Sequence, residues 1–269
     1  MSRIAGQFEL MRREGRKGFI PFVTAGDPEV AISTEIVLKL ADVGADVIEL
    51  GVPFSDPMAD GPTIQRSSQR ALLNGVSVGD VLSIARRVRE AVSTPIVLFS
   101  YLNPLLSYGF RQLVRDAAEA GIDGILLTDA IDDEAAEFSG MMAEHGLDLI
   151  SLVAPTTTDA RLEKIATRSR GFLYAVSRAG VTGAQANMSG DAARLVERAR
   201  NHTELPIAVG FGISTREQIL DVWEFADAAV VGSAIVSEIE KSLLEDPVEA
   251  VETFVGGLMP QFAKSGSEL

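Results

Sequence analysis

Eight short apolar runs recur along the chain, and each one is bounded by Gly, Pro or Asp. They are rich in Val, Ile, Leu and Phe, as expected for strands that are buried on both faces of a parallel sheet. The runs cover residues 19–24, 46–51, 95–101, 124–128, 147–153, 171–177, 206–212 and 228–233. The sequence therefore predicts eight parallel strands.

Segments between these runs have the spacing of amphipathic helices. In residues 29–44, for example, four apolar side chains fall near one helical face, and residues 77–92 repeat the pattern. A third helix is predicted to open at Ser214, where Glu217 three residues later indicates a capping box. Further helices are predicted near 109–120, 132–145, 159–168 and 191–201.

Strands that alternate with helices define an α/β protein, and eight strands favour a single (β/α)8 TIM barrel. An open doubly wound sheet is the alternative. The intervals from 46 to 95 and from 171 to 206 are longer than the others, and their extra residues follow strands two and six. These long loops lie at the carboxyl ends of the strands, where barrels carry their chemistry. No composition shift divides residues 1–269, so we expect one domain.

Composition excludes several functions. The net charge is −14, which argues against nucleic-acid binding because that needs clustered Lys and Arg. The chain has no cysteine, which excludes disulfides and zinc–thiolate sites, and we expect no metal site. No apolar stretch reaches about 18 residues and no signal-peptide pattern occurs, so we expect no membrane contact and a cytoplasmic location.

Glu49 ends the second predicted strand. Side chains alternate in direction along a strand, so Val47 and Glu49 share one face while Ile48 and Leu50 share the other. If Ile48 and Leu50 pack against the outer helices, Glu49 points into the barrel near its mouth. Partial desolvation there would raise its pKa towards neutrality, as a proton donor and acceptor requires. A glutamate that only caps a loop backbone is an equally good interpretation.

Two aspartates follow in the loop after the second strand. Asp60, with more solvent than Glu49, would stay ionised and could accept a hydrogen bond from a substrate N–H. An Asp before Gly-Pro is also a common turn residue, and this interpretation stays open. Asp56 in "SDP" has the same alternative and no clear catalytic placement.

The same alternation turns several aromatic side chains inward near the carboxyl ends of the strands. An aromatic mouth would suit a flat, apolar substrate, although ordinary core packing explains any single one of them. The residues are Phe22, Phe99, Tyr101, Tyr174 and Phe211.

Glycine-rich turns follow the last three strands, in residues 177–184, 210–214 and 232–236. Backbone N–H groups at such turns and at helix starts bind anions, and barrels frequently bind phosphate after strands seven and eight. The three turns together predict a phosphate site.

These motifs resemble one known family. The segments "GFIPFVTAGDP", "IELGVPFSDPMADGPTIQ", "YAVSRAGVTGA", "GFGIS" and "GSAIV" are similar to those of the tryptophan synthase alpha chain. The resemblance runs from about Gly18 to Val236, and it includes an extra N-terminal helix and a C-terminal helix. It implies a lyase that splits indole-3-glycerol phosphate into indole and glyceraldehyde 3-phosphate by retro-aldol cleavage.

The resemblance also implies residue roles. Glu49 would be the proton shuttle, Asp60 would hold the indole N–H, and Tyr174 would support the site. Thr182 would pair with Asp60 when the loops close. Phe22, Phe99 and Phe211 would flank the ring, and Tyr101 would line the substrate site. Phosphate would bind at Gly183, Gly212, Gly232 and Ser233.

A partner is implied as well. The family assembles with a beta chain, and we expect an alpha2-beta2 heterotetramer in which Asp56 helps couple the first loop to the partner. Pyridoxal phosphate would lie on the beta chain, and this chain would carry no cofactor. Indole would pass to the beta chain through a tunnel. Ile131 stands where the family usually has proline, which puts details of interchain contact in doubt.

Two alternatives remain at this point. The chain could be another phosphate-binding barrel enzyme, such as an isomerase or a stand-alone indole-3-glycerol phosphate lyase. It could also be a non-catalytic barrel that acts as an allosteric partner.

Overall fold

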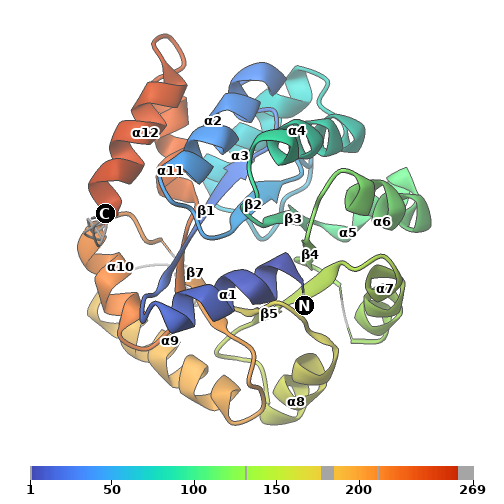
Figure 1. The fold of residues 1–269 in the computed structure, drawn as a ribbon, viewed down its shortest axis with the longest axis vertical. Coiled ribbons are helices and arrows are strands. Elements are labelled where there is room, and N and C mark those ends of the chain that lie inside the picture. The colour runs from blue at the N-terminus through green and yellow to red at the C-terminus, as the bar shows by residue number, and fades with distance from the viewer. Residues whose placement is uncertain (1, 131, 177–184, 211, 260–269) are drawn as a thin grey trace, which may run out of the picture.

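The computed structural model describes residues 2–130, 132–176, 185–210 and 212–259, with backbone alone at 132–134 and 185–189. Eight parallel strands form a closed barrel in chain order, and β8 pairs back onto β1 (Figure 1). This confirms the (β/α)8 barrel and excludes the open sheet. The strands are β1 (Gly18–Thr24), β2 (Ile48–Gly51), β3 (Ile96–Ser100), β4 (Gly124–Leu127), β5 (Asp148–Val153), β6 (Leu173–Val176), β7 (Ile207–Gly210) and β8 (Ala228–Val231).

Helices surround the barrel, and the expected N-terminal helix α1 (Arg3–Arg13) crosses one end of it (Figure 1). The others are α2 (Val30–Asp42), α3 (Pro62–Leu73), α4 (Val78–Ala91), α5 (Leu102–Tyr108), α6 (Phe110–Glu119), α7 (Asp132–Glu144), α8 (Asp159–Arg168), α9 (Gln185–Arg200), α10 (Arg216–Trp223), α11 (Ser233–Lys241) and α12 (Pro247–Leu258). Sequence periodicity did not predict α3 and α5. It also placed the start of α9 near 191, whereas the helix begins at Gln185.

The predicted capping box of α10 was wrong by one residue. Thr215 is the N-cap, and its side chain accepts a hydrogen bond from the Gln218 N–H. The Gln218 side chain in turn accepts from the N–H groups of Ser214 and Thr215. A glutamine at the third helical position completes a capping box as well as a glutamate does, so Glu217 was not the required partner.

The core has two layers, as the alternation along the strands predicts. Val47 and Val97 point into the barrel and pack with Ile20, Leu126 and Ile150. The intervening side chains, including Ile48 and Leu50, point outward and pack against the surrounding helices. Neighbouring strands are in register at this level, with Phe22 beside Glu49 and Glu49 beside Val97. The alternation therefore delivers Glu49 to the barrel interior.

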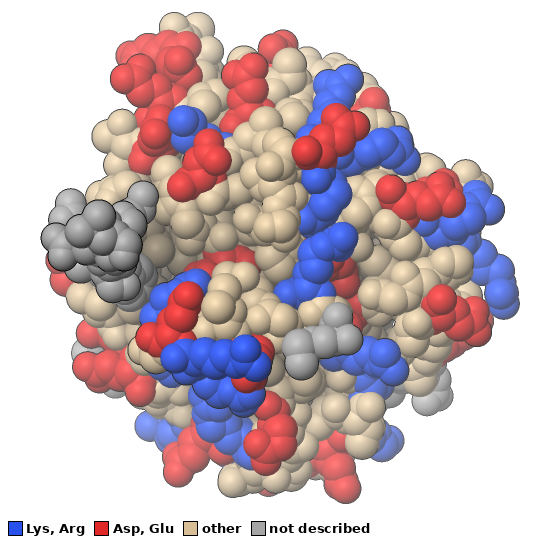
Figure 2. Space-filling model, viewed as in Figure 1, with Lys and Arg blue, Asp and Glu red and all other residues tan. Residues whose placement is uncertain are grey.

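Aspartates tie the strands together at the end of the barrel that α1 covers. Asp46, Asp123 and Asp227 each accept a hydrogen bond from the N–H near the start of a neighbouring strand, at 2.9 Å. Asp123 also pairs with Arg3 at 2.6 Å and with Arg89 at 2.8 Å. Lys and Arg lie among Asp and Glu across this face (Figure 2). Positive and negative side chains are paired locally here, and these pairs stabilise the end of the barrel that α1 covers.

None of the described helices is long and apolar enough to cross a membrane.

Candidate active site

A cavity of about 600 Å³ opens at the carboxyl ends of the strands, opposite α1. It collects residues that are far apart in the sequence but follow neighbouring strands. Its lining includes Phe22, Glu49, Ala59, Asp60, Ile64, Phe99, Tyr174, Gly210, Gly212, Val230, Gly232 and Ser233. The carboxylate, aromatic and glycine signals of the sequence therefore meet in one pocket.

Glu49 lies at the base of this pocket and is completely buried. Neither carboxyl oxygen has a hydrogen-bond partner among the described residues. Burial raises the pKa of Glu49 well above its usual value, because the charged form is not solvated there. The alternative of a glutamate that caps a loop backbone does not fit, since no described backbone N–H reaches the carboxyl. Desolvation is also more complete than the sequence predicted.

Asp60 lies at the rim and is more exposed than Glu49, as expected. Burial nevertheless raises the pKa of Asp60 to about 6, while a hydrogen bond from Tyr101 opposes the rise. The carboxyl is thus mostly ionised at neutral pH, but its pKa lies closer to neutrality than that of a solvated aspartate.

Tyr101 holds the loop that carries Asp60. Its hydroxyl accepts a hydrogen bond from the Ala59 N–H at 2.9 Å and donates one to the Asp60 carboxylate. Its ring packs against Phe54 with ring centroids 5.2 Å apart. Tyr101 was predicted to line the substrate site. It lies beside that loop and lines, with Phe22, Asp60 and Phe99, a small cavity next to the pocket, and its place at the substrate site stays a prediction. The alternation of side chains along the strand did not predict the contact between Tyr101 and this loop.

Tyr174 and Phe22 depend on glycines in adjacent strands. The Tyr174 hydroxyl occupies the space that a Cβ would need at Gly210. A Cβ at Gly51 would likewise lie 2.5 Å from the Phe22 ring. Phe22 meets Phe99 edge to face, with centroids 5.2 Å apart. The sequence analysis did not single out Gly51 and Gly210, although a glycine that ends a buried strand is a signal of close approach.

The opposite side of the pocket is built from backbone. Gly232 is the N-cap of α11 and Ser233 is its first residue, so the start of this helix, where backbone N–H groups lack partners within the helix, lines the cavity. Gly212 has φ +57°, a conformation that favours glycine. Helix N-termini with such turns attract anions through unpaired N–H groups and the helix dipole.

Three predicted site residues, Thr182, Gly183 and Phe211, lie outside the described residues. Asp56 is exposed and lies away from the pocket, on a separate surface groove with Phe54, Pro57 and Met58. Its side chain accepts a hydrogen bond from the Ser55 hydroxyl at 2.5 Å. The structure therefore separates Asp56 from the two carboxyl groups of the pocket.

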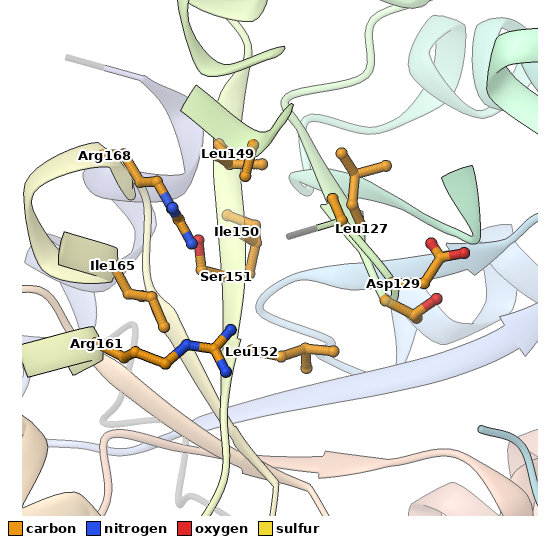
Figure 3. Close-up of a pocket in the computed structure, with 12 residues that line it drawn as sticks. Leu127, Asp129, Leu149, Ile150, Ser151, Leu152, Arg161, Ile165 and Arg168 are labelled. Carbon is orange, nitrogen blue, oxygen red and sulfur yellow. The ribbon is translucent and has the colours of Figure 1, made fainter. Parts of the chain in front are cut away.

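A second, smaller cavity of about 190 Å³ lies outside the barrel wall. Arg161 and Arg168 extend from α8 toward β5, with Leu127 and Asp129 on the other side (Figure 3). Ser151 of β5 lines it, and the Ser151 hydroxyl accepts a hydrogen bond from Ser169 at 2.7 Å. The two cavities share no lining residue, so this one is separate from the Glu49 pocket.

Fold and pocket together define a (β/α)8 barrel with two carboxyl groups of raised pKa in a pocket at the carboxyl ends of its strands, which is where enzymes of this fold carry their active sites. Comparison with known proteins narrows this class. The family model described as tryptophan synthase alpha chain matches residues 8–261. A tryptophan synthase alpha chain from Geobacter sulfurreducens is 47% identical over 258 residues, covering 96% of this chain and 98% of the relative. One from Solibacter usitatus is 50% identical over 242 residues, covering 90% and 91%.

Solved structures agree. Tryptophan synthase subunit alpha from Legionella pneumophila superposes with a TM-score of 0.89 at 37% identity, covering 96% of this chain and 97% of the other. Tryptophan synthase from M. tuberculosis in its aminoacrylate-bound form gives 0.86 at 35% identity, with 96% and 98% covered. The chain belongs to the tryptophan synthase alpha chain family. It is a lyase of tryptophan biosynthesis, and the comparisons favour neither a stand-alone lyase nor a non-catalytic barrel.

Proposed function

We propose that Glu49 is the proton shuttle in the cleavage of indole-3-glycerol phosphate to indole and glyceraldehyde 3-phosphate. The buried, protonated carboxyl donates its proton to indole C3. The resulting carboxylate accepts the proton of the hydroxyl on the adjacent glycerol carbon. That carbon becomes the aldehyde, and the electrons of the broken carbon–carbon bond return to the ring. Glu49 ends the cycle protonated, as it began.

Asp60 stabilises the charge that develops in this step. Protonation at C3 places positive charge on the indole nitrogen, and an ionised carboxylate that accepts the N–H hydrogen bond offsets it. The pKa of about 6 leaves Asp60 mostly ionised at neutral pH, which supports this role. Glu49 and Asp60 thus have opposite protonation states in one pocket, which is the pattern that acid–base enzymes use.

The remaining residues bind and orient the substrate. The phosphate would be held by backbone groups of Gly183, Gly212 and Gly232 and by Ser233. Phe22, Phe99 and Phe211 would flank the ring, Tyr174 would support Glu49, and Thr182 would meet Asp60 on loop closure. Tyr101 acts through Asp60 and Ala59. This assignment is supported by the one pocket that is lined together by Phe22, Phe99, Tyr174, Gly212, Gly232 and Ser233.

One observation carries the proposal, namely that Glu49 is buried in the pocket with neither oxygen paired among the described residues. A group without a partner is free to exchange a proton with a substrate. The test is an assay for indole released from indole-3-glycerol phosphate by the purified chain. Glu49→Gln removes the proton transfer while keeping the shape. Indole release by this variant at the wild-type rate would exclude Glu49 as the shuttle.

An alpha chain implies a beta-chain partner, and we propose an alpha2-beta2 heterotetramer in the cytoplasm. The groove beside Asp56 supports the contact, because Met58 and Leu73 on it are 93% and 79% exposed. Pyridoxal phosphate would be held by the beta chain, and this chain would need no cofactor or metal. Light scattering on a mixture of the two chains measures the stoichiometry. Asp56→Ala should weaken assembly and leave the cleavage by the isolated chain unchanged.

A further inference from the structure

The ring end and the phosphate end of the pocket are presented by two helices that pack against each other. Asp60 lies directly before α3, which begins at Pro62, and the first turn of α3 lines the cavity. α11 begins at Ser233, which lines the opposite side. The two helices are in contact with each other. A shift of either helix therefore changes the distance between the two ends of the site.

A charge network joins these helices at one carboxylate. Glu240, near the end of α11, accepts two hydrogen bonds from Arg66 at 2.7 Å each and one from Arg70 at 2.8 Å. Arg66 and Arg70 are four residues apart on α3 and so lie on the same face. The two arginines hold the pKa of Glu240 down, at about 2. Glu240 is therefore ionised throughout the working pH range.

The same network reaches the loop after β1. Arg70 donates two hydrogen bonds to Asp27, at 2.8 and 2.9 Å. The Asp27 side chain is completely buried, whereas Arg70 is 20% exposed and Glu240 25% exposed. Paired contacts between Arg and a carboxylate have a fixed geometry, and partial burial reduces their screening by salt. Two arginines and two carboxylates thus fix α3, α11 and the end of β1 to one another.

We propose that Glu240 is a positioning residue that couples the phosphate end of the pocket to the ring end. This inference rests on the proposed function, because it takes phosphate at Ser233 and the indole ring at Asp60. An anion bound at the start of α11 fixes that helix. Glu240 passes the constraint to α3, and α3 holds the loop of Asp60 in the position that accepts the indole N–H. Phosphate should therefore tighten the binding of indole.

Glu238 provides a matched control on the same helix. Its side chain is 26% exposed, close to the 25% of Glu240, but its ion pair is with Lys241 of α11 itself. Glu238→Gln removes a similar charge without touching α3. Glu240→Gln removes the ionic link between α11 and α3 while leaving their packing contact. Arg66→Gln removes two of the three hydrogen bonds to Glu240 and leaves the Arg70–Asp27 pair in place. It serves as a second variant if Glu240→Gln does not fold.

The experiment measures the Kd of indole for the full chain with and without saturating inorganic phosphate. We expect phosphate to tighten indole binding at least about fivefold in the wild type and in Glu238→Gln. The ratio should fall below about twofold in Glu240→Gln and to an intermediate value in Arg66→Gln. The Kd of phosphate alone should change little, which a general loss of structure would not allow.

Either of two results would overturn the coupling. One is a wild-type ratio retained in both Glu240→Gln and Arg66→Gln. The other is a ratio near one in the wild type itself. If the wild type still releases indole from indole-3-glycerol phosphate, only the coupling is wrong. If it releases none, the proposed function fails independently of the binding ratios.

Discussion

The hydroxyl of Tyr174 fills the space that a side chain at Gly210 would need. The two residues are on adjacent strands, β6 and β7, and both line the pocket that holds Glu49. Burial keeps the pKa of the Tyr174 hydroxyl well above the usual value, and the nearby carboxyl groups of Glu49 and Asp60 act in the same direction whenever they are ionised. The absence of a side chain at residue 210 is thus part of the geometry of the site.

Gly210→Ala should therefore impair catalysis more than folding. The added methyl displaces the Tyr174 hydroxyl from its place in the pocket, and overpacking of this kind costs about 1–3 kcal/mol. We expect cleavage to fall at least about tenfold, which corresponds to about 1.4 kcal/mol. Gly140→Ala is the control, because a Cβ at Gly140 in α7 meets no atom within 4 Å. Equal rates of indole release by Gly210→Ala and Gly140→Ala would show that the space at residue 210 does not contribute to catalysis.

Glu49→Gln should abolish indole release and preserve the fold. The amide has the shape of the protonated carboxyl but cannot transfer its proton, and loss of general acid–base catalysis costs about 10²- to 10⁴-fold in rate. Steady-state turnover and the urea midpoint measure the two effects. A parallel loss of stability and activity would point instead to a structural role for Glu49.

The pH dependence of kcat/KM should show the titration of Asp60 as an acidic limb, on which the rate falls as the pH falls. Its pKa in the free chain is about 6, above the usual aspartate value of 3.8, so the ionised form is lost as the pH falls through about 6. Activity should decline on that limb because a protonated carboxyl accepts the indole N–H poorly. Asp60→Asn should lower the rate and remove the limb. A limb that persists in Asp60→Asn belongs to another group.

Tyr101→Phe should move the same limb upward. The hydroxyl donates to the Asp60 carboxylate and so lowers its pKa, and without it the pKa of Asp60 rises further. The Ala59 N–H also loses its acceptor, at a cost of about 1 kcal/mol. Tyr108→Phe is the control, since that hydroxyl binds Asp116 outside the pocket, at 2.8 Å. An unchanged limb in Tyr101→Phe would show that the contact does not tune Asp60.

Asp123→Asn should destabilise the fold without changing the chemistry. The buried carboxylate binds Arg3, Arg89 and the Ile96 N–H, and loss of its charge leaves the largely buried Arg89 guanidinium without its ionic partner. We expect a loss of about 2–4 kcal/mol in the free energy of unfolding, measured by urea denaturation. Asp191→Asn, which alters an exposed pair with Arg194, should change stability little. Similar effects of the two variants would contradict this account.

Local patterns in the sequence were enough to predict the strands and the direction of Glu49. Strand periodicity is a property of consecutive residues, so the inward position of Glu49 and the outward positions of Ile48 and Leu50 followed directly. The glycine-rich turn at Gly232, where α11 begins, was also predicted, because such a turn is a property of consecutive residues. The capping box at Ser214 and Glu217 was wrong because two overlapping patterns fit the same segment.

Only the tertiary structure decided which distant residues meet. No periodicity relates Tyr101 to Ala59, Tyr174 to Gly210, or Glu240 to Arg66 and Arg70. These contacts follow from barrel closure and helix packing, which set distances between residues far apart in the chain. Complete desolvation of Glu49 likewise depends on every strand around it. The residue order determined the barrel and its catalytic face, and three-dimensional packing determined how the acids on that face are held.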